Sequence, residues 1–151
     1  MAARAVAVTS AFFACPALAT DSSGISVAVV AYGDYGKLDI SPSDKTGNWH
    51  LQAKTNQDTD VAVLDAKIAA NGYFGWHTHP GATFVTVLSG TLTEYELDCS
   101  TTTHKPGDTF VEPPNHVHDV RSTGGAEVVA VMILPHGAQP EDNSPPGPTC
   151  P

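Results

Sequence analysis

Basic residues are scarce in this chain. Among 151 residues, 7 lysines and arginines stand against 16 aspartates and glutamates, which gives a formal net charge of −9. The sequence contains no basic run and no basic patch interleaved with aromatic residues. An acidic surface repels phosphate backbones and anionic lipids, so the composition argues against a nucleic-acid partner and against an anionic membrane surface.

Long apolar runs and helical periodicity are also missing. The apolar run at residues 5–14 is too short to span a bilayer. No window repeats hydrophobic residues with a helical period, and no heptad or internal repeat is visible. A chain of this length fits one domain with a useful core, and no transmembrane segment is expected.

The first 19 residues have the three parts of a secretory signal peptide. Arg4 is their only charge, an apolar run follows, and residues 17–19 read Ala-Leu-Ala, a small-x-small cleavage signal. We therefore expect a secreted protein, extracellular or periplasmic. The alternatives are a buried N-terminal strand or helix and a lipid anchor at Cys15, for which the flanking residues form a poor signal.

Cysteine is rare, with 3 in the chain. Signal cleavage would remove Cys15 and leave Cys99 and Cys150, an even number for an oxidising compartment. We predict a disulfide between these two, which would tie the Pro-rich tail, residues 135–151, to the turn after residues 91–97. The chain-entropy model assigns such a loop about 4 kcal/mol of stabilisation. Two free thiols are the alternative.

From residue 21 onward, short apolar segments alternate with clusters of Gly, Pro, Asn and Asp, a pattern typical of an all-β sandwich or barrel. Asn71-Gly72 reads as a two-residue hairpin turn. We predict an all-β jelly roll of two packed antiparallel sheets. The expected strands are residues 25–32, 48–54, 60–70, 73–79, 83–88, 91–97, 109–111, 116–121 and 127–134.

Two stretches carry paired histidines. Residues 71–90 read NGYFGWHTHPGATFVTVLSG and hold His77 and His79, while residues 107–118 read GDTFVEPPNHVH and end in a second His-x-His. Side chains at i and i+2 of a strand leave the same face, so each pair points into one space. Two such pairs predict a metal site, although exposed sheet histidines would look the same.

The first stretch resembles the first motif of the cupin superfamily. His77 and His79 match its histidine pair, and Gly90 matches its closing glycine. Gly72 stands one residue closer to His77 than the usual glycine, and Thr83 occupies the position of the usual glutamate.

The second stretch resembles the second cupin motif. Gly107, Pro113 and His118 are in place, Asn115 replaces a glycine, and Ser122 replaces a frequent asparagine. Asn tolerates the left-handed backbone of the glycine, so that exchange is mild. The resemblance extends to small secreted bacterial single-domain cupins. The expected organisation is a signal peptide at 1–19, N-terminal strands and loops at 20–59, a cupin core at 60–134 and a disulfide-pinned tail at 135–151.

The resemblance implies that His77, His79 and His118 hold one divalent transition metal, with open positions for water or substrate. With Thr83 in place of the glutamate, we expect the ion to keep its full charge and to favour anionic or chelating substrates. Thr83 would either hydrogen-bond a metal-bound water or be an ordinary strand residue. His116 is an additional candidate, as a fourth ligand, as a hydrogen-bonding neighbour of a ligand or as part of the pocket mouth.

Further polar residues surround the motifs or lie outside them. Glu112 and Asp119 flank the second motif and are candidates for orienting a ligand, although solvated loop carboxylates are commoner. His50, His104 and His136 belong to no motif and are expected at the surface.

The metal could be Fe, Cu, Zn, Mn or Ni, because imidazole suits several of them. Iron or copper would point to an oxygen-dependent oxidoreductase, similar to the three-histidine dioxygenases among cupins. The other metals would allow a Lewis-acid isomerase, lyase or hydrolytic step. The sequence supplies no obvious general base, which favours the oxidoreductase acting on a small molecule. A non-catalytic small-molecule or metal-binding module is the alternative, and a homodimer is left open.

Overall fold

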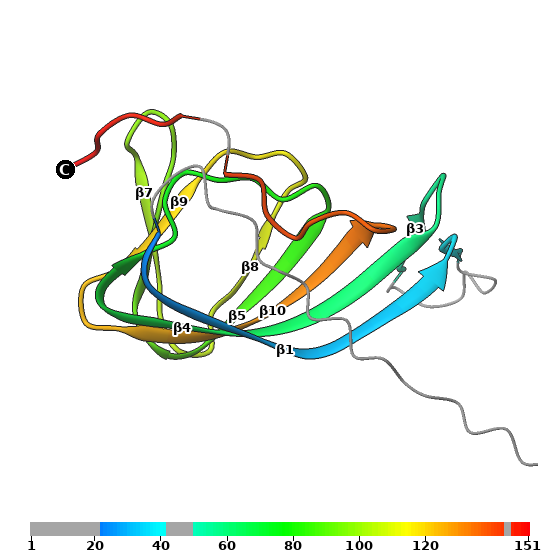
Figure 1. The fold of residues 1–151 in the computed structure, drawn as a ribbon, viewed down its shortest axis with the longest axis horizontal. Helices are drawn as coiled ribbons and strands as arrows, with labels where there is room; N and C mark the ends of the chain where they lie inside the picture. Colours follow the sequence, from blue (N-terminus) through cyan, green and yellow to red (C-terminus); the bar gives the residue numbers. More distant parts are fainter. Residues whose placement is uncertain (1–21, 42–49, 144–145) are drawn as a thin grey trace, which may run out of the picture.

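The computed structural model describes residues 22–41, 50–143 and 146–151, and all regular structure in these ranges is β-strand (Figure 1). The all-β prediction is therefore confirmed. The predicted signal peptide lies outside the described residues. In the described part of the chain, no helix is long and apolar enough to cross a membrane. The strands are β1 (Ser23–Gly36), β2 (Asp39–Ile40), β3 (Ala53–Lys54), β4 (Thr59–Tyr73), β5 (Ala82–Gly90), β6 (Leu92–Tyr95), β7 (Thr101–His104), β8 (Thr109–Glu112), β9 (Asp119–Ser122) and β10 (Ala126–Pro135).

Eight strands form one antiparallel sheet in the order β7-β6-β9-β4-β10-β5-β8, and β1 pairs with β4 beside this path. The sheet curls so that β1, β4, β10 and β5 make one curved wall and β6, β7 and β9 rise at one end of it (Figure 1). This nearly closed barrel is the predicted jelly roll. β2 and β3 form a separate two-stranded ribbon.

The hairpin predicted at Asn71-Gly72 is wrong, because both residues lie inside β4. Asn71 has a φ of 61°, so the left-handed backbone signalled by its sequence is real. It bends the strand instead of reversing it. Beyond the bend, Gly72 pairs with Ser122 on β9, whereas the earlier part of β4 pairs with β10. A Cβ on Gly72 would come 2.9 Å from the carbonyl oxygen of Ala69, so the bend requires a glycine there.

Several strand predictions also need correction, and one strand was not predicted. β4 ends at Tyr73, so residues 74–79 are irregular, with isolated bridges at His77 and Thr78. The strand expected at 116–121 begins at Asp119. β7 was missed because TTTH lacks apolar alternation, and it forms because β6 supplies a partner along its whole length. Of the strand expected at 48–54, residues 48 and 49 lie outside the described residues, residues 50–52 are irregular, and only Ala53–Lys54 form a strand, β3.

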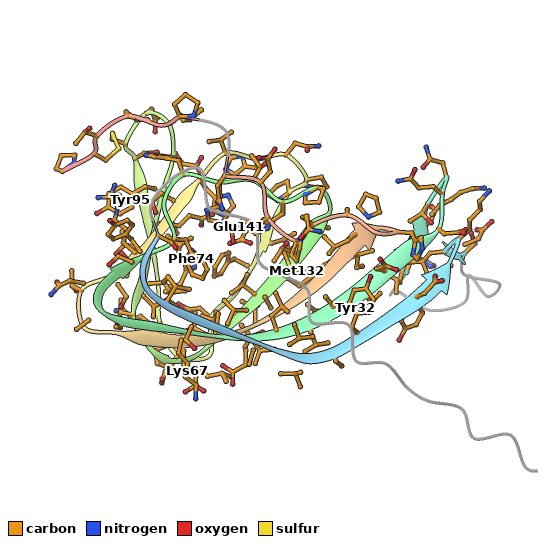
Figure 2. All side chains as sticks on the ribbon, viewed as in Figure 1. Tyr32, Lys67, Phe74, Tyr95, Met132 and Glu141 are labelled. Atoms are coloured by element: carbon orange, nitrogen blue, oxygen red, sulfur yellow. A yellow bond between two sulfur atoms is a disulfide. The ribbon has the colours of Figure 1, made fainter. Side chains whose placement is uncertain are left out.

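The core lies on the concave face of the curved wall (Figure 2). Along β10, even-numbered side chains are buried and odd-numbered ones are half-buried, as the two-residue period of a strand requires. Val128 and Ala130 belong to the main apolar cluster, and Met132 belongs to a second one. This alternation places the walls of the pocket described below.

The C-terminal tail is attached to the barrel at several points. A disulfide joins Cys99 and Cys150, as predicted from the cysteine count. Trp76 donates its indole N–H to the carbonyl of Pro148 at 2.9 Å. Gly147 lies against the same indole, since a Cβ there would come within 2.0 Å of the ring. The tail is thereby held beside the segment that carries the first histidine pair.

Candidate metal centre

The structure brings His77, His79 and His118 together. All three are buried, and one nitrogen of each lies within 4.8 Å of those of the other two. His77 and His118 form a two-residue antiparallel bridge, in which each N–H donates to the other's carbonyl at 2.9 and 3.1 Å. Directly paired residues project from the same face, so this bridge brings their ring centroids to 4.3 Å.

Backbone carbonyls determine which ring nitrogen faces the centre. The pairs are His77 Nδ1 with the carbonyl of Gly75 (2.8 Å), His79 Nδ1 with that of Pro140 (2.8 Å) and His118 Nδ1 with that of His116 (3.0 Å). A carbonyl only accepts hydrogen bonds, so each Nδ1 carries the proton when the ring is neutral and each Nε2 keeps its lone pair. This is the usual arrangement of histidines that ligate a metal, and the three residues fit a metal ion.

A carboxylate completes the cluster. Glu112 is buried on β8, and its Oε2 and Oε1 lie 3.2 Å from the Nε2 atoms of His79 and His118. Thr83 on β5 is its direct cross-strand partner. The facing strand therefore places a carboxylate beside two of the three histidines, in a cluster where position 83 carries a threonine.

The charges of the cluster follow from burial and from this carboxylate. Burial lowers the pKa of His77 to about 3, and the neighbouring His118 and His79 lower it further, so the ring is neutral. Burial alone would raise the pKa of Glu112, but hydrogen bonds from the Nε2 atoms of His118 and His79, which donate only when these rings are protonated, outweigh burial and hold that pKa well below its ordinary value. Burial likewise opposes the charge of His118, yet contact with Glu112 raises its pKa. The buried anion favours a positive charge at the same place.

Thr83 and His116, the additional candidates, have different positions. Thr83 is buried, and its Oγ1 has no hydrogen-bond partner among the described residues. It lines the same cavity as the histidines. The imidazole of His116 lies outside the three-histidine cluster, with Nε2 2.9 Å from Glu96 Oε2. Its carbonyl orients His118, which fits a supporting role.

Asp119 supports the loop that carries His77. One carboxylate oxygen accepts the N–H of Gly75 at 3.0 Å, and the other accepts Arg121 Nε at 2.7 Å. The carbonyl of Gly75 in turn accepts the proton of His77. Asp119 therefore positions a histidine of the cluster without belonging to it.

The surface prediction holds for His50 and His136 and is wrong for His104. His104 is buried, stacks on Phe110 with ring centroids 3.9 Å apart, and lies 3.1 Å from Glu94. Cross-strand pairing with Leu92 turns this imidazole inward. The polar sequence around His104 did not indicate that its side chain is buried.

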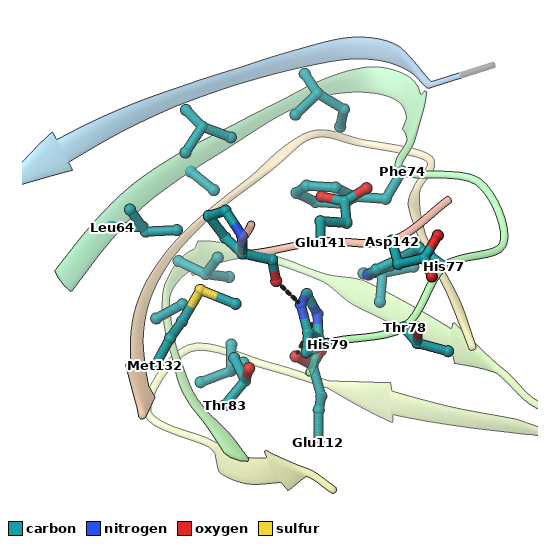
Figure 3. Close-up of a pocket in the computed structure, with 18 of the residues that line it drawn as sticks. Leu64, Phe74, His77, Thr78, His79, Thr83, Glu112, Met132, Glu141 and Asp142 are labelled. Atoms are coloured by element: carbon teal, nitrogen blue, oxygen red, sulfur yellow. Dashed lines mark hydrogen bonds and ion pairs between the residues drawn. The ribbon is translucent and has the colours of Figure 1, made fainter. Parts of the chain in front are cut away.

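The cluster lies at one end of an open cavity of about 880 Å³ (Figure 3). A segment of the tail, residues 138–143, lies along this cavity and is called the strap below. Thr78 and Asp142 exchange backbone hydrogen bonds of 2.8 and 2.9 Å, and Pro140 accepts the proton of His79. Glu141 of the strap lines the cavity, and burial raises its pKa. Nothing in the Pro-rich sequence around Glu141 indicated this position.

Residues 64–134 match a family model described as a cupin domain. No curated protein matches the chain. Similar solved structures include a conserved protein of unknown function from Streptococcus pyogenes (23% identity over 51% of this chain and 67% of that one, TM-score 0.47) and a conserved protein with a double-stranded β-helix domain from Klebsiella pneumoniae (22% identity, 54% and 72%, TM-score 0.47). A structure of DMSP lyases is also similar, with 18% identity, 60% coverage of this chain and a TM-score of 0.50.

The chain covers 46% of that lyase chain, and at these identities the likeness concerns the fold. The family match spans both histidine-bearing stretches and most of the barrel. From this match, residues 64–134 belong to the cupin superfamily.

Proposed function

We propose that this chain is a mononuclear metal-binding cupin that acts on a small molecule, with His77, His79, His118 and Glu112 as ligands. The observation that supports it best is the set of three buried imidazoles, each oriented by a backbone carbonyl at its Nδ1, which leaves its Nε2 as the atom available to a metal ion. One carboxylate beside three imidazoles suits Fe, Mn, Ni, Cu or Zn. A bound ion would supply Lewis-acid polarisation of a coordinated oxygen and, if redox-active, electron transfer.

The protein's own residues would divide the remaining work. Glu112 offsets part of the charge of the ion and holds His79 and His118 in place. Thr83 offers its buried, unpartnered hydroxyl to a polar group of the ligand. Glu141 lies on the strap, and because burial raises its pKa it is suited to accept or return a proton.

Glu141 changes the order of the candidate activities. The oxygen-dependent oxidoreductase was favoured because the sequence showed no general base, and Glu141 provides one at the cavity. We therefore propose metal-assisted proton transfer, of the isomerase or lyase type, as the first candidate. The oxidoreductase is second, since a redox-active ion held by these residues would supply electron transfer.

Metal content and oxygen dependence test this proposal together. Protein purified without a histidine tag is expected to contain about one transition-metal ion per chain, as measured by elemental analysis. Negligible metal after reconstitution with each of the five metals would contradict the proposal. Turnover that persists without oxygen would support proton transfer, and oxygen uptake with native iron or copper would support the oxidoreductase. Full metal occupancy without turnover of any compound screened would favour the non-catalytic module.

We also propose that the protein is secreted. The proposal rests on the signal-like residues 1–19 and is supported by the disulfide between Cys99 and Cys150, because such bonds persist in oxidising compartments. N-terminal sequencing of protein recovered outside the cytoplasm is expected to begin at Thr20. An N-terminus at Met1 would contradict it.

A homodimer through β1 is the last part of this proposal. Among the described strands, β1 pairs only with β4, and Val29, Val30 and Tyr32 are 60–65% exposed. The unpaired backbone N–H and C=O groups of such an edge strand can pair with a strand of another chain. In a chain with a net charge of −9, the only charged residue of β1 is Asp34, which limits the repulsion between two copies at this strand. Light scattering is expected to show a dimer that Val30→Lys converts to monomer, and a monomeric native protein would contradict it.

A further inference from the structure

We infer that the cavity takes an uncharged, largely apolar small molecule whose single polar group points toward the histidine cluster. The inference deepens the proposed function and rests on it, because it takes the cluster as the end where the polar group is held. It replaces the sequence-based expectation of an anionic or chelating substrate.

Strand register gives the wall a sharp change of polarity. One rung across β4, β10, β5 and β8 consists of Leu64, Ala130, Val85 and Phe110. The next inward-facing rung consists of Ala62, Met132, Thr83 and Glu112. All of these except Ala62 line the cavity. Two residues of a strand span roughly 6.6 Å. Within that distance the wall changes from wholly apolar to one with a hydroxyl and a carboxylate.

Further residues extend the apolar region of the cavity. Ile25 and Val27 of β1, Ile68 of β4 and Phe74 also line it. In Figure 3, Leu64 and Met132 lie on the wall away from His77, whereas Phe74 lies beside the cluster. A ligand that fills this space must leave water along most of its length, which favours apolar groups. A charged group placed here would lose its hydration without a partner.

The charges around the cavity argue against anionic ligands. Its described lining contains no lysine or arginine, and its only charged residues besides histidine are Glu112, Glu141 and Asp142. An anion would therefore meet carboxylates at the strap before it reached the cluster. A cation would be opposed by a metal ion in the cluster. Burial raises the pKa of Glu141, which is consistent with low polarity around it.

The test uses a fluorescent neutral probe, N-phenyl-1-naphthylamine, with the full-length protein in metal-free and metal-loaded forms. We expect saturable binding of about one probe per chain, independent of metal. Three competitors with a ten-carbon chain then compare charge in the metal-loaded form: 1-decanol, decanoate and decyltrimethylammonium. Decanol is expected to displace the probe at least about tenfold better than either ion, a difference of about 1.4 kcal/mol. Equal displacement by an ion, or binding without saturation, would overturn the inference.

Two positions on one strand provide a matched control. Ala130→Phe fills the apolar rung and is expected to weaken probe binding at least tenfold with unchanged metal content. Val131→Phe, on the outer face of β10, should change neither probe binding nor metal content. Val85→Thr is a near-isosteric second variant that adds a hydroxyl to the rung, and it should weaken decanol binding several-fold even if Ala130→Phe fails to fold. Unchanged decanol binding in Val85→Thr would contradict the placement.

Glu141→Gln tests the discrimination against anions. It is expected to improve displacement by decanoate several-fold and to leave displacement by decanol unchanged. Equal effects on both competitors would contradict the role of Glu141. Protein that binds metal but not the neutral probe would overturn this inference alone. Protein that binds the probe but never a metal would overturn the proposed function and leave the ligand class in place.

Discussion

Thr83 and Glu112 face each other across β5 and β8, and through this pair the histidine cluster gains a carboxylate from the strand opposite the expected one. Directly opposed residues have Cβ atoms about 5 Å apart. A glutamate can therefore change strands within such a pair and still reach the same ring nitrogens. The exchange keeps an anion in the cluster while leaving a hydroxyl at position 83.

Exchanging the two side chains tests their equivalence. Glu112→Thr is expected to weaken metal binding by about tenfold to a hundredfold, because a group that holds two of the histidines is lost. The double variant Thr83→Glu, Glu112→Thr should recover most of that loss. Calorimetric titration with Zn²⁺ and Mn²⁺ measures both. A double variant as weak as Glu112→Thr would show that the two positions are not interchangeable.

His116 and His118 are expected to differ in their effect on metal binding. His118→Ala removes a buried Nε2 and should reduce the metal content to a small fraction. His116→Ala leaves the backbone carbonyl that orients His118, and its imidazole contacts Glu96 outside the cluster. The variant His116→Ala should therefore weaken metal binding less than His118→Ala does. Elemental analysis after dialysis distinguishes the two, and equal losses would make His116 a ligand.

The disulfide is expected to stabilise the tail. Cys99 and Cys150 are 51 residues apart, and the chain-entropy model gives about 4 kcal/mol for a loop of this size. The double variant Cys99→Ser, Cys150→Ser should lower the free energy of unfolding by up to that amount in urea titrations. Non-reducing peptide mapping of the native protein should recover the linked pair. Two free thiols in secreted protein would contradict it.

Stability should depend on pH through His136 and Asp60, whose Nδ1 and Oδ1 atoms lie 2.8 Å apart. A hydrogen bond to Asp60 raises the pKa of His136 above 6.5. Hydrogen bonds from Tyr32, Gly137 and His136 lower the pKa of Asp60 from 3.8 to about 2. The contribution of His136 is complete below pH 6.5 and is lost as the pH rises through its raised pKa. That of Asp60 is complete above pH 3.8 and is lost as the pH falls toward 2.

Thermal unfolding across pH checks this window. His136→Gln should melt below the native protein at pH 5, and the difference should shrink toward zero at pH 9. His50→Gln, at an exposed position, is the matched control and should match the native protein throughout. A difference that stayed constant from pH 5 to pH 9 would exclude the ion pair as its cause.

Local patterns were sufficient for the fold and for three of the cluster residues. Short apolar segments with a two-residue period predict strands from sequence, because burial on one face selects every second residue. The spacing within His77-Thr-His79 places both rings on one side even though the segment proved irregular. Cys99 and Cys150 are the two cysteines that remain after the predicted signal cleavage, and this even number indicated their disulfide.

Tertiary structure decided the rest, because contacts between distant strands depend on register and not on local pattern. The register of β8 against β5 turns Glu112 from an apparent loop carboxylate into a buried neighbour of two histidines. Pairing of β4 with β9 makes Asn71-Gly72 a bend within a strand instead of a hairpin. The tail, attached by a disulfide and by Trp76, brings Glu141 to the cavity. Each outcome requires partners at least ten residues away in sequence, so the local pattern alone could not determine it.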